Sequence, residues 1–130
     1  MNRVLPLVGR LCFVAIFAHS AWGDLHDIHP FFARVAALGL PLPNVAAAVA
    51  LALLVVGTVS IALGAWARVG GWCFVVFLAA VTPMAHKFWG VPDAMRAMQQ
   101  EAQFLKNVSL LGAALMIAAS GVGPFSLTRK

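Results

Sequence analysis

An uncharged and strongly apolar run from Val45 to Trp66 constrains the fold of this chain more than any other feature. The run contains 22 residues and no Asp, Glu, Lys, Arg or His. A helix needs about 20 predominantly apolar residues to cross the hydrocarbon core of a bilayer. Because lipid offers no hydrogen-bond partners, the backbone polar groups of a spanning segment must be satisfied internally, as they are in a helix. The run therefore predicts a transmembrane helix.

The composition extends this prediction to the whole chain, which is long enough for a single domain of residues 1–130. Hydrophobic residues make up 62% of the chain and charged residues 10%, compared with about 45–50% and about 25% in soluble domains. The nine basic residues, which give a net charge of +5, are scattered and lie mostly at the ends of apolar runs, where cations meet lipid headgroups. The lipid bilayer is thus the expected partner, and nucleic acid is not.

Four apolar segments organise the chain. The expected spans are residues 9–25, 45–66, 69–86 and 103–121. Between the second and third spans, Arg68, Gly70 and Gly71 predict a tight turn, which only antiparallel helices can share. A cap near Val91 or Asp93 is expected to start the helix that continues into the fourth span. The sequence therefore predicts an all-α membrane protein, an antiparallel bundle of four transmembrane helices.

The connector from His26 to Asn44 carries a second helical signal. Pro30 suits a first helical position, and Gly39 is a typical stop. Four apolar side chains follow Pro30 at helical spacing, namely Phe31, Phe32, Val35 and Leu38. This pattern predicts a short helix in the membrane interface between spans 1 and 2, with Asn44 as the cap of the next helix.

The distribution of basic residues orients the bundle. Four spans place both termini on one side, which carries no acidic residue and five basic ones: Arg3, Arg10, Arg68, Arg129 and Lys130. The opposite side carries all four acidic residues and four basic ones: Arg34, Lys87, Arg96 and Lys106. Since cytoplasmic loops are enriched in Lys and Arg, we expect a multi-pass protein of the cytoplasmic (inner) membrane with both termini in the cytoplasm.

A cleaved signal peptide is the alternative interpretation of the first span. Arg3, the apolar stretch after it and the small residues Ala18, Ser20 and Ala21 fit that pattern. Cleavage would leave three spans, and it would remove His19, a residue that is unusual in a signal core.

Polar side chains are concentrated between His86 and Asn107. This stretch contains a His, two Lys, one Arg, both kinds of acid, three Gln and an Asn. It joins two apolar segments, so it is expected to lie against the membrane surface on the side away from the termini. The stretch is the first place to look for a binding site.

The order of short motifs along the chain resembles that of the DoxX family of small four-helix membrane proteins. The motifs are, in order, Gly9-Arg10-Leu11, Ser20-Ala21-Trp22-Gly23, Leu38-Gly39-Leu40-Pro41, Leu63-Gly64, Arg68, His86, Phe88-Trp89, Gln103-Phe104-Leu105-Lys106-Asn107, Leu110-Leu111-Gly112, Gly121-Val122-Gly123-Pro124 and Ser126-Leu127. The resemblance covers nearly the whole chain, and the ordered set is more specific than any single motif.

The resemblance implies a role beside membrane-bound redox enzymes. Members of the family include a subunit of a thiosulfate:quinone oxidoreductase and components of assemblies with thiol and superoxide enzymes, while most have no assigned reaction. This chain departs from the family pattern at two positions, because the family often has Lys where Asp24 stands and commonly has Glu where Leu54 stands. The Lys and the Glu of the family pattern are therefore both missing here, and whether the chain is itself an enzyme stays open.

The candidate site is a pocket for a quinone-like or other small redox ligand at the end of the bundle away from the termini. His86 is expected to donate a hydrogen bond to a ligand carbonyl. Aromatic side chains would form a flat apolar wall and amide or ammonium groups would add donors, and these residues are Phe88, Trp89, Gln103, Lys106 and Asn107. Ligand pockets of this kind are mostly apolar with a few placed polar groups. The alternative is structural: Lys106 reaches toward the headgroups, Trp89 anchors at the interface and Asn107 bonds between helices.

The other histidines suggest two further hypotheses. His19 lies near the middle of the first span, where an ionisable group is costly and tends to be functional, although a neutral imidazole bonded to a neighbouring helix would also explain it. His26 and His29 lie close to two Asp residues and are weak candidates for metal ligands. Their spacing matches no standard zinc pattern, so neither metal nor haem is expected, and quinone is the cofactor class that the candidate site favours.

The leading hypothesis is a small subunit or partner of a membrane-bound, quinone-linked redox system, in contact with other membrane or membrane-associated redox proteins. A non-catalytic scaffold that anchors a partner complex and a small-molecule permease are the alternatives. The near absence of polar residues from the second span argues against a permease. The oligomeric state, a homo-oligomer included, stays open.

Overall fold

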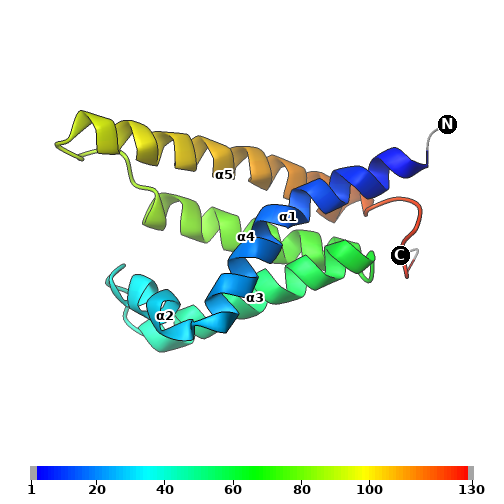
Figure 1. Ribbon diagram of the computed structural model, residues 1–130, viewed down its shortest axis with the longest axis horizontal. Helices are drawn as coiled ribbons and strands as arrows, with labels where there is room; N and C mark the ends of the chain where they lie inside the picture. Colours follow the sequence, from blue (N-terminus) through cyan, green and yellow to red (C-terminus); the bar gives the residue numbers. More distant parts are fainter. Residues whose placement is uncertain (1–2, 129–130) are drawn as a thin grey trace.

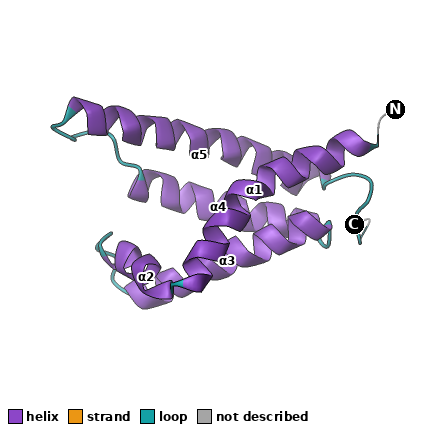
Figure 2. Ribbon diagram, in the orientation of Figure 1, coloured by secondary structure: helices purple, strands orange, loops and turns teal. Residues whose placement is uncertain are grey.

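The computed structural model describes residues 3–128, and this part of the chain contains five helices and no strand (Figure 1; Figure 2). The helices are α1 (Val4–His26), α2 (Ile28–Ala36), α3 (Pro43–Leu63), α4 (Ala67–Ala85) and α5 (Ala94–Ser120). Judged by length and composition, α1, α3, α4 and α5 are each able to cross a membrane. The predicted fold class is confirmed, including the short helix between the first two spans, while the limits of the spans within a bilayer stay predictions.

The helices α3, α4 and α5 pack side by side and antiparallel, and α1 crosses over α3 and α4 (Figure 1). Both ends of the described chain lie at one end of the bundle, together with the turn between α3 and α4 (Figure 1). We call this the terminal end. The opposite end holds α2 and the connection between α4 and α5, and we call it the His86 end.

Three phenylalanines join α1 to α4 at the centre of the bundle. The ring centroids of Phe13 and Phe17 lie 5.5 Å and 4.1 Å from that of Phe74, and Phe74 is completely buried. Gly57 of α3 makes room for this ring, because a Cβ atom there would lie 2.9 Å from a ring carbon of Phe74. This packing fixes where α1 crosses the other helices.

The predicted turn at Arg68, Gly70 and Gly71 is wrong, because all three residues lie inside α4. The chain instead reverses at residues 64–66, where the φ angles of Gly64 and Trp66 are both positive. The two glycines in α4 have a packing role. A Cβ atom at Gly71 would lie 2.6 Å from the backbone nitrogen of Ala118 in α5. A glycine pair serves a turn and a close helix contact equally well, so the sequence alone did not separate the two.

The helix starts agree with the sequence in one case and not in another. The side chain of Asp93 accepts hydrogen bonds from the backbone N–H groups of Met95 (2.9 Å) and Arg96 (3.4 Å), which confirms Asp93 as the cap of α5. The prediction of Asn44 as a cap is wrong, because α3 begins one residue earlier, at Pro43. Proline suits a first helical position, since its missing N–H would have no partner there.

The C-terminal segment 121–128 folds back over the turn between α3 and α4. The backbone N–H of Leu127 donates to the carbonyl of Leu63 (3.4 Å), and that of Thr128 donates to the carbonyl of Gly64 (3.2 Å). These bonds satisfy carbonyl groups at the end of α3, which have no partner within the helix. The segment therefore closes the terminal end of the bundle.

Arg10 of α1 ties this segment to the bundle. Its guanidinium group donates to the carbonyl of Phe125 (2.7 Å) and to the hydroxyl of Ser126 (3.3 Å). The sequence placed Arg10 near a membrane interface, and the structure shows that the residue is only 6% exposed. The opening and closing motifs of the chain thus meet in space at one buried cation.

Candidate functional site

A cavity of about 250 Å³ lies at the His86 end, and all five helices contribute to it. We call it the His86 cavity. Its apolar wall consists of Ile16, Phe17, Leu54, Phe77, Leu78, Val81, Ala85 and Leu110. Its polar side chains are those of Ser20, Asp24, Arg34, His86, Lys106 and Asn107. An apolar body with a few polar groups is the usual composition of a small-molecule site.

Asn107 is the most informative residue of the His86 cavity. Its side chain lines the cavity, the residue is only 6% exposed, and its amide has no hydrogen-bond partner within residues 3–128. The amide atoms are not among the fully buried side-chain atoms without a partner, so they can be reached although the residue as a whole is nearly buried. A molecule in the cavity can therefore pair with this amide.

Two glutamines on α5 form hydrogen bonds with polar side chains of the cavity, those of His86 and Lys106. Nδ1 of the half-buried His86 lies 3.1 Å from Oε1 of Gln100. The Lys106 ammonium donates to Oε1 of Gln103, one turn earlier on the same helix. Neither glutamine lines the cavity, so each acts on the cavity through the side chain that it holds.

Two of the lining residues of the cavity form an ion pair. Arg34, near the end of α2, donates to the carboxylate of Asp24, near the end of α1, over 2.7 Å. The side chain of Asp24 is 16% exposed and that of Arg34 is 62% exposed. An exposed pair of this kind adds about 0–1 kcal/mol to stability. Its main effect is to neutralise one charge of each sign beside the cavity, and within residues 3–128 the Lys106 ammonium has no acidic partner.

The structure brings together three of the six residues that the sequence singled out, namely His86, Lys106 and Asn107. Trp89 does not line the cavity, and its ring packs against those of Phe88 (5.3 Å between centroids) and Phe104 (6.1 Å). These three rings form an aromatic cluster beside the cavity rather than a wall of it. Gln103 lies outside the cavity and contacts it only through Lys106.

His19 lies away from the site. It is exposed on α1, whereas the packed face of that helix carries Phe13, Phe17 and Ala21. The side chain of His19 has no hydrogen bond within the described part of the chain. The structure therefore places it on the outer surface of the bundle.

The two weak metal candidates have other contacts. The ring of His26 stacks on that of Trp22 (6.2 Å between centroids), and the backbone N–H of His29 donates to the side chain of Asp27, which caps α2. Both histidines are exposed. Between residues 3 and 128, no three His, Cys, Asp or Glu side chains gather in a group that could hold a metal ion.

Four polar residues of the site were not assigned to it from the sequence, namely Ser20, Asp24, Arg34 and Gln100. Gln100 lies seven residues before Asn107, and this spacing of two helical turns places both on one face of α5. Asp24 and Arg34 have opposite charges and lie on two helices separated only by Asp27. Both signals are visible in the sequence, but they become specific only once the helix boundaries are known.

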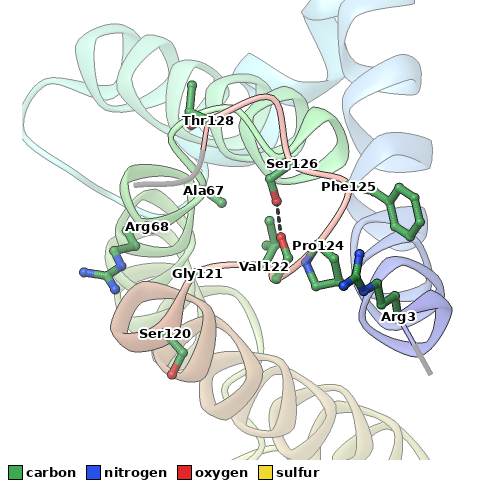
Figure 3. Close-up of a pocket in the computed structure, with 11 residues that line it drawn as sticks. Arg3, Ala67, Arg68, Ser120, Gly121, Val122, Pro124, Phe125, Ser126 and Thr128 are labelled. Atoms are coloured by element: carbon green, nitrogen blue, oxygen red, sulfur yellow. Dashed lines mark hydrogen bonds between the residues drawn. The ribbon is translucent and has the colours of Figure 1, made fainter. Parts of the chain in front are cut away.

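A larger cavity, of about 670 Å³, lies at the terminal end. Figure 3 shows Arg3 and Arg68 on opposite sides of the segment from Gly121 to Pro124, so their guanidinium groups do not converge on one point. The hydroxyl groups of Ser126 and Thr128 are already hydrogen-bonded. Among the described residues that line this cavity, no polar side chain is nearly buried as Asn107 is, and we do not assign this cavity as the site.

An apolar groove of about 290 Å³ runs beside the His86 cavity between α2, α3 and α4. It is lined by apolar side chains only, and it shares Phe77 and Val81 with the His86 cavity. The two hollows are thus neighbours on either side of these residues.

Comparisons with known proteins place the chain in a family. The family model described as DoxX matches residues 5–87, a range that covers α1 to α4 and His86. Inner membrane protein YphA of Escherichia coli (strain K12) is 30% identical over 128 residues, an alignment that covers 98% of this chain and 90% of YphA. No solved structure gives a significant match. The four apolar helices and the inner-membrane relative support a multi-pass inner-membrane protein. The chain belongs to the DoxX family.

Proposed function

We propose that the protein holds the head group of a quinone-type redox carrier in the His86 cavity and serves as a small subunit or partner of a membrane-bound redox system. The observation that carries this proposal is the amide of Asn107, which belongs to a nearly buried residue of the cavity lining and has no hydrogen-bond partner within residues 3–128. An oxygen of a quinone-type ring would pair with this amide. The Lys106 ammonium, which no acid balances, adds a further attraction for an electron-rich oxygen.

The sizes of the two neighbouring hollows support an amphipathic ligand. The His86 cavity, at about 250 Å³, is smaller than the roughly 300–1,000 Å³ of sites for drug-sized molecules, so it suits a single ring. The apolar groove of about 290 Å³ on the other side of Phe77 and Val81 suits an alkyl tail. A carrier with a polar ring and an apolar tail matches both.

The orientation in the membrane belongs to the same proposal. The excess of basic residues at the terminal end supports cytoplasmic termini, and the His86 cavity would then open toward the outer surface. A redox partner would meet the cavity from that side, where the polar first turns of α5 are exposed.

The proposal predicts that Asn107→Leu weakens the binding of a short-chain alkyl benzoquinone by about tenfold or more. Leucine is close in shape to asparagine and removes only the amide, so a lost hydrogen bond of about 1–3 kcal/mol accounts for the change. The measurement is the dissociation constant of the quinone for protein purified in mild detergent. Asn44→Leu, the same substitution at an exposed residue of α3, is the matched control and is expected to bind like the unaltered protein.

Other results would favour other functions. Equal affinity of Asn107→Leu and the unaltered protein would contradict the quinone site. A constant protein partner that copurifies with both, without any quinone binding, would favour a scaffold, and movement of a solute into liposomes by the protein alone would favour a permease.

A further inference from the structure

The hydrogen bond between His86 and Gln100 decides which kind of ligand atom the His86 cavity accepts. Nδ1 of His86 lies 3.1 Å from Oε1 of Gln100, and a carbonyl oxygen can only accept a hydrogen bond. With the Gln100 amide oxygen toward the ring, as it is in the structure, Nδ1 carries the hydrogen. In a neutral imidazole the other nitrogen, Nε2, then has a lone pair and no hydrogen.

Nε2 of His86 is left as an unpaired acceptor. The ring lines the cavity, and Nε2 has no hydrogen-bond partner within residues 3–128. It is also not one of the side-chain atoms that are fully buried without a partner, so it can be reached. Since His86 lines the cavity, Nε2 is the atom of the ring that remains free for a ligand there.

The cavity thus offers bonding groups of different kinds. His86 offers an acceptor at Nε2, the Lys106 ammonium offers the donors that its bond to Gln103 leaves free, and the Asn107 amide offers donors at its nitrogen and an acceptor at its oxygen. A ring hydroxyl can donate to Nε2 while its oxygen accepts from one of the donors. A ring carbonyl has no hydrogen to donate, so it would leave Nε2 without a partner and place two lone pairs against each other.

We propose that Gln100 fixes His86 in the tautomer with hydrogen on Nδ1, and that the His86 cavity therefore binds the reduced, hydroxyl-bearing form of its carrier in preference to the oxidised form. This inference rests on the proposed function for the class of ligand. Gln100 does not line the cavity, so it is a positioning residue that acts through His86. In this proposal His86 accepts a hydrogen bond from the ligand, whereas the sequence led us to expect that His86 donates one to a ligand carbonyl.

The tautomer is tested first, on protein without ligand, so the result does not depend on the proposed function. Protein labelled with ¹⁵N-histidine in detergent gives ¹H–¹⁵N spectra that distinguish the two tautomers, and the His86 signals are assigned from their loss in His86→Gln. The unaltered protein is expected to show hydrogen on Nδ1, and Gln100→Leu is expected to show a mixture. Gln99→Leu, a substitution at the exposed neighbour, controls for a general change in α5. Hydrogen on Nε2 in the unaltered protein would overturn the inference.

The preference is tested next with one short-chain alkyl benzoquinone and its reduced quinol, under anaerobic conditions. The quinol is expected to bind about tenfold more tightly to the unaltered protein, and the ratio is expected to approach one in Gln100→Leu but not in Gln99→Leu. If the quinone binds as tightly as the quinol or more tightly, and the tautomer is as expected, the preference for the reduced form is wrong. The assignment of the His86 cavity as a binding site would still hold. Binding of neither form would overturn the proposed function and this preference together.

Discussion

Gly71→Val is expected to force α4 and α5 apart and to lower the stability of the bundle by about 1–3 kcal/mol or more, the range measured for overpacked sites. A Cβ atom at Gly71 would lie 2.6 Å from the nitrogen and 2.9 Å from the Cα atom of Ala118. Both are backbone atoms, so no side-chain rotation relieves the contact and α5 itself must shift. The measurement is the midpoint of thermal unfolding in detergent, with tryptophan fluorescence as the signal.

The same substitution at Gly112 is the matched control. Gly112 also lies in one of the two helices, α5, but a Cβ atom there would meet nothing within 4 Å. Valine is a slightly better helix former than glycine, so Gly112→Val is expected to keep or slightly raise the midpoint. Residues of both α4 and α5 line the His86 cavity. Because Gly71→Val moves these two helices apart, the substitution is also expected to abolish ligand binding. Unchanged unfolding of Gly71→Val would show that the two helices are not in close contact.

Arg10→Leu is expected to release the C-terminal segment 121–128 and to lower the stability by about 1.5–3 kcal/mol, the value of a hydrogen bond from a charged group. The substitution removes both bonds of the guanidinium, to Phe125 and Ser126, and leaves the carbonyl of Phe125 without its donor. Hydrogen exchange is the measurement, because the amides of Leu127 and Thr128 bond to the end of α3 only while the segment is docked.

Arg68→Leu is the control for the loss of a positive charge at the same end of the bundle. Arg68 is exposed and makes no hydrogen bond or ion pair within the described residues, so exchange at Leu127 and Thr128 is expected to stay slow. Fast exchange in both variants would mean that the net charge, and not the buried bonds of Arg10, keeps the segment in place.

The parts of the fold that were predictable from the sequence are the apolar helices, because a bilayer requires them, and the local cap at the start of α5. An apolar run such as residues 45–66 has one stable solution in a bilayer, and Asp93 has the chemistry of a helix cap whatever surrounds it. The roles of Gly70 and Gly71 were not predictable in the same way. Their meaning depends on Ala118, which lies far along the chain, and the pattern of glycines alone fits a turn equally well.

The site was predictable in part, for a related physical reason. His86, Lys106 and Asn107 stand out because polar residues are rare in this chain, and they do line one cavity. His19 stands out for the same reason but lies on the exposed side of α1. A helix that is apolar on all sides carries little information about which face looks inward, so the direction in which His19 points was not predictable. Arg10 shows the same limit, because only the fold reveals the segment that buries it.

The central claim, that the His86 cavity holds a quinone-type head group, is tested most directly by photochemical labelling. A short-chain benzoquinone that carries an azide on its ring is bound to the protein in detergent, activated by light and located by mass spectrometry of the peptides. The account predicts labels concentrated on residues 77–85 of α4, on His86 and on residues 106–110 of α5, and their loss in Asn107→Leu. Labels spread over exposed residues such as Trp72 and Met116, or labels that persist in Asn107→Leu, would contradict it.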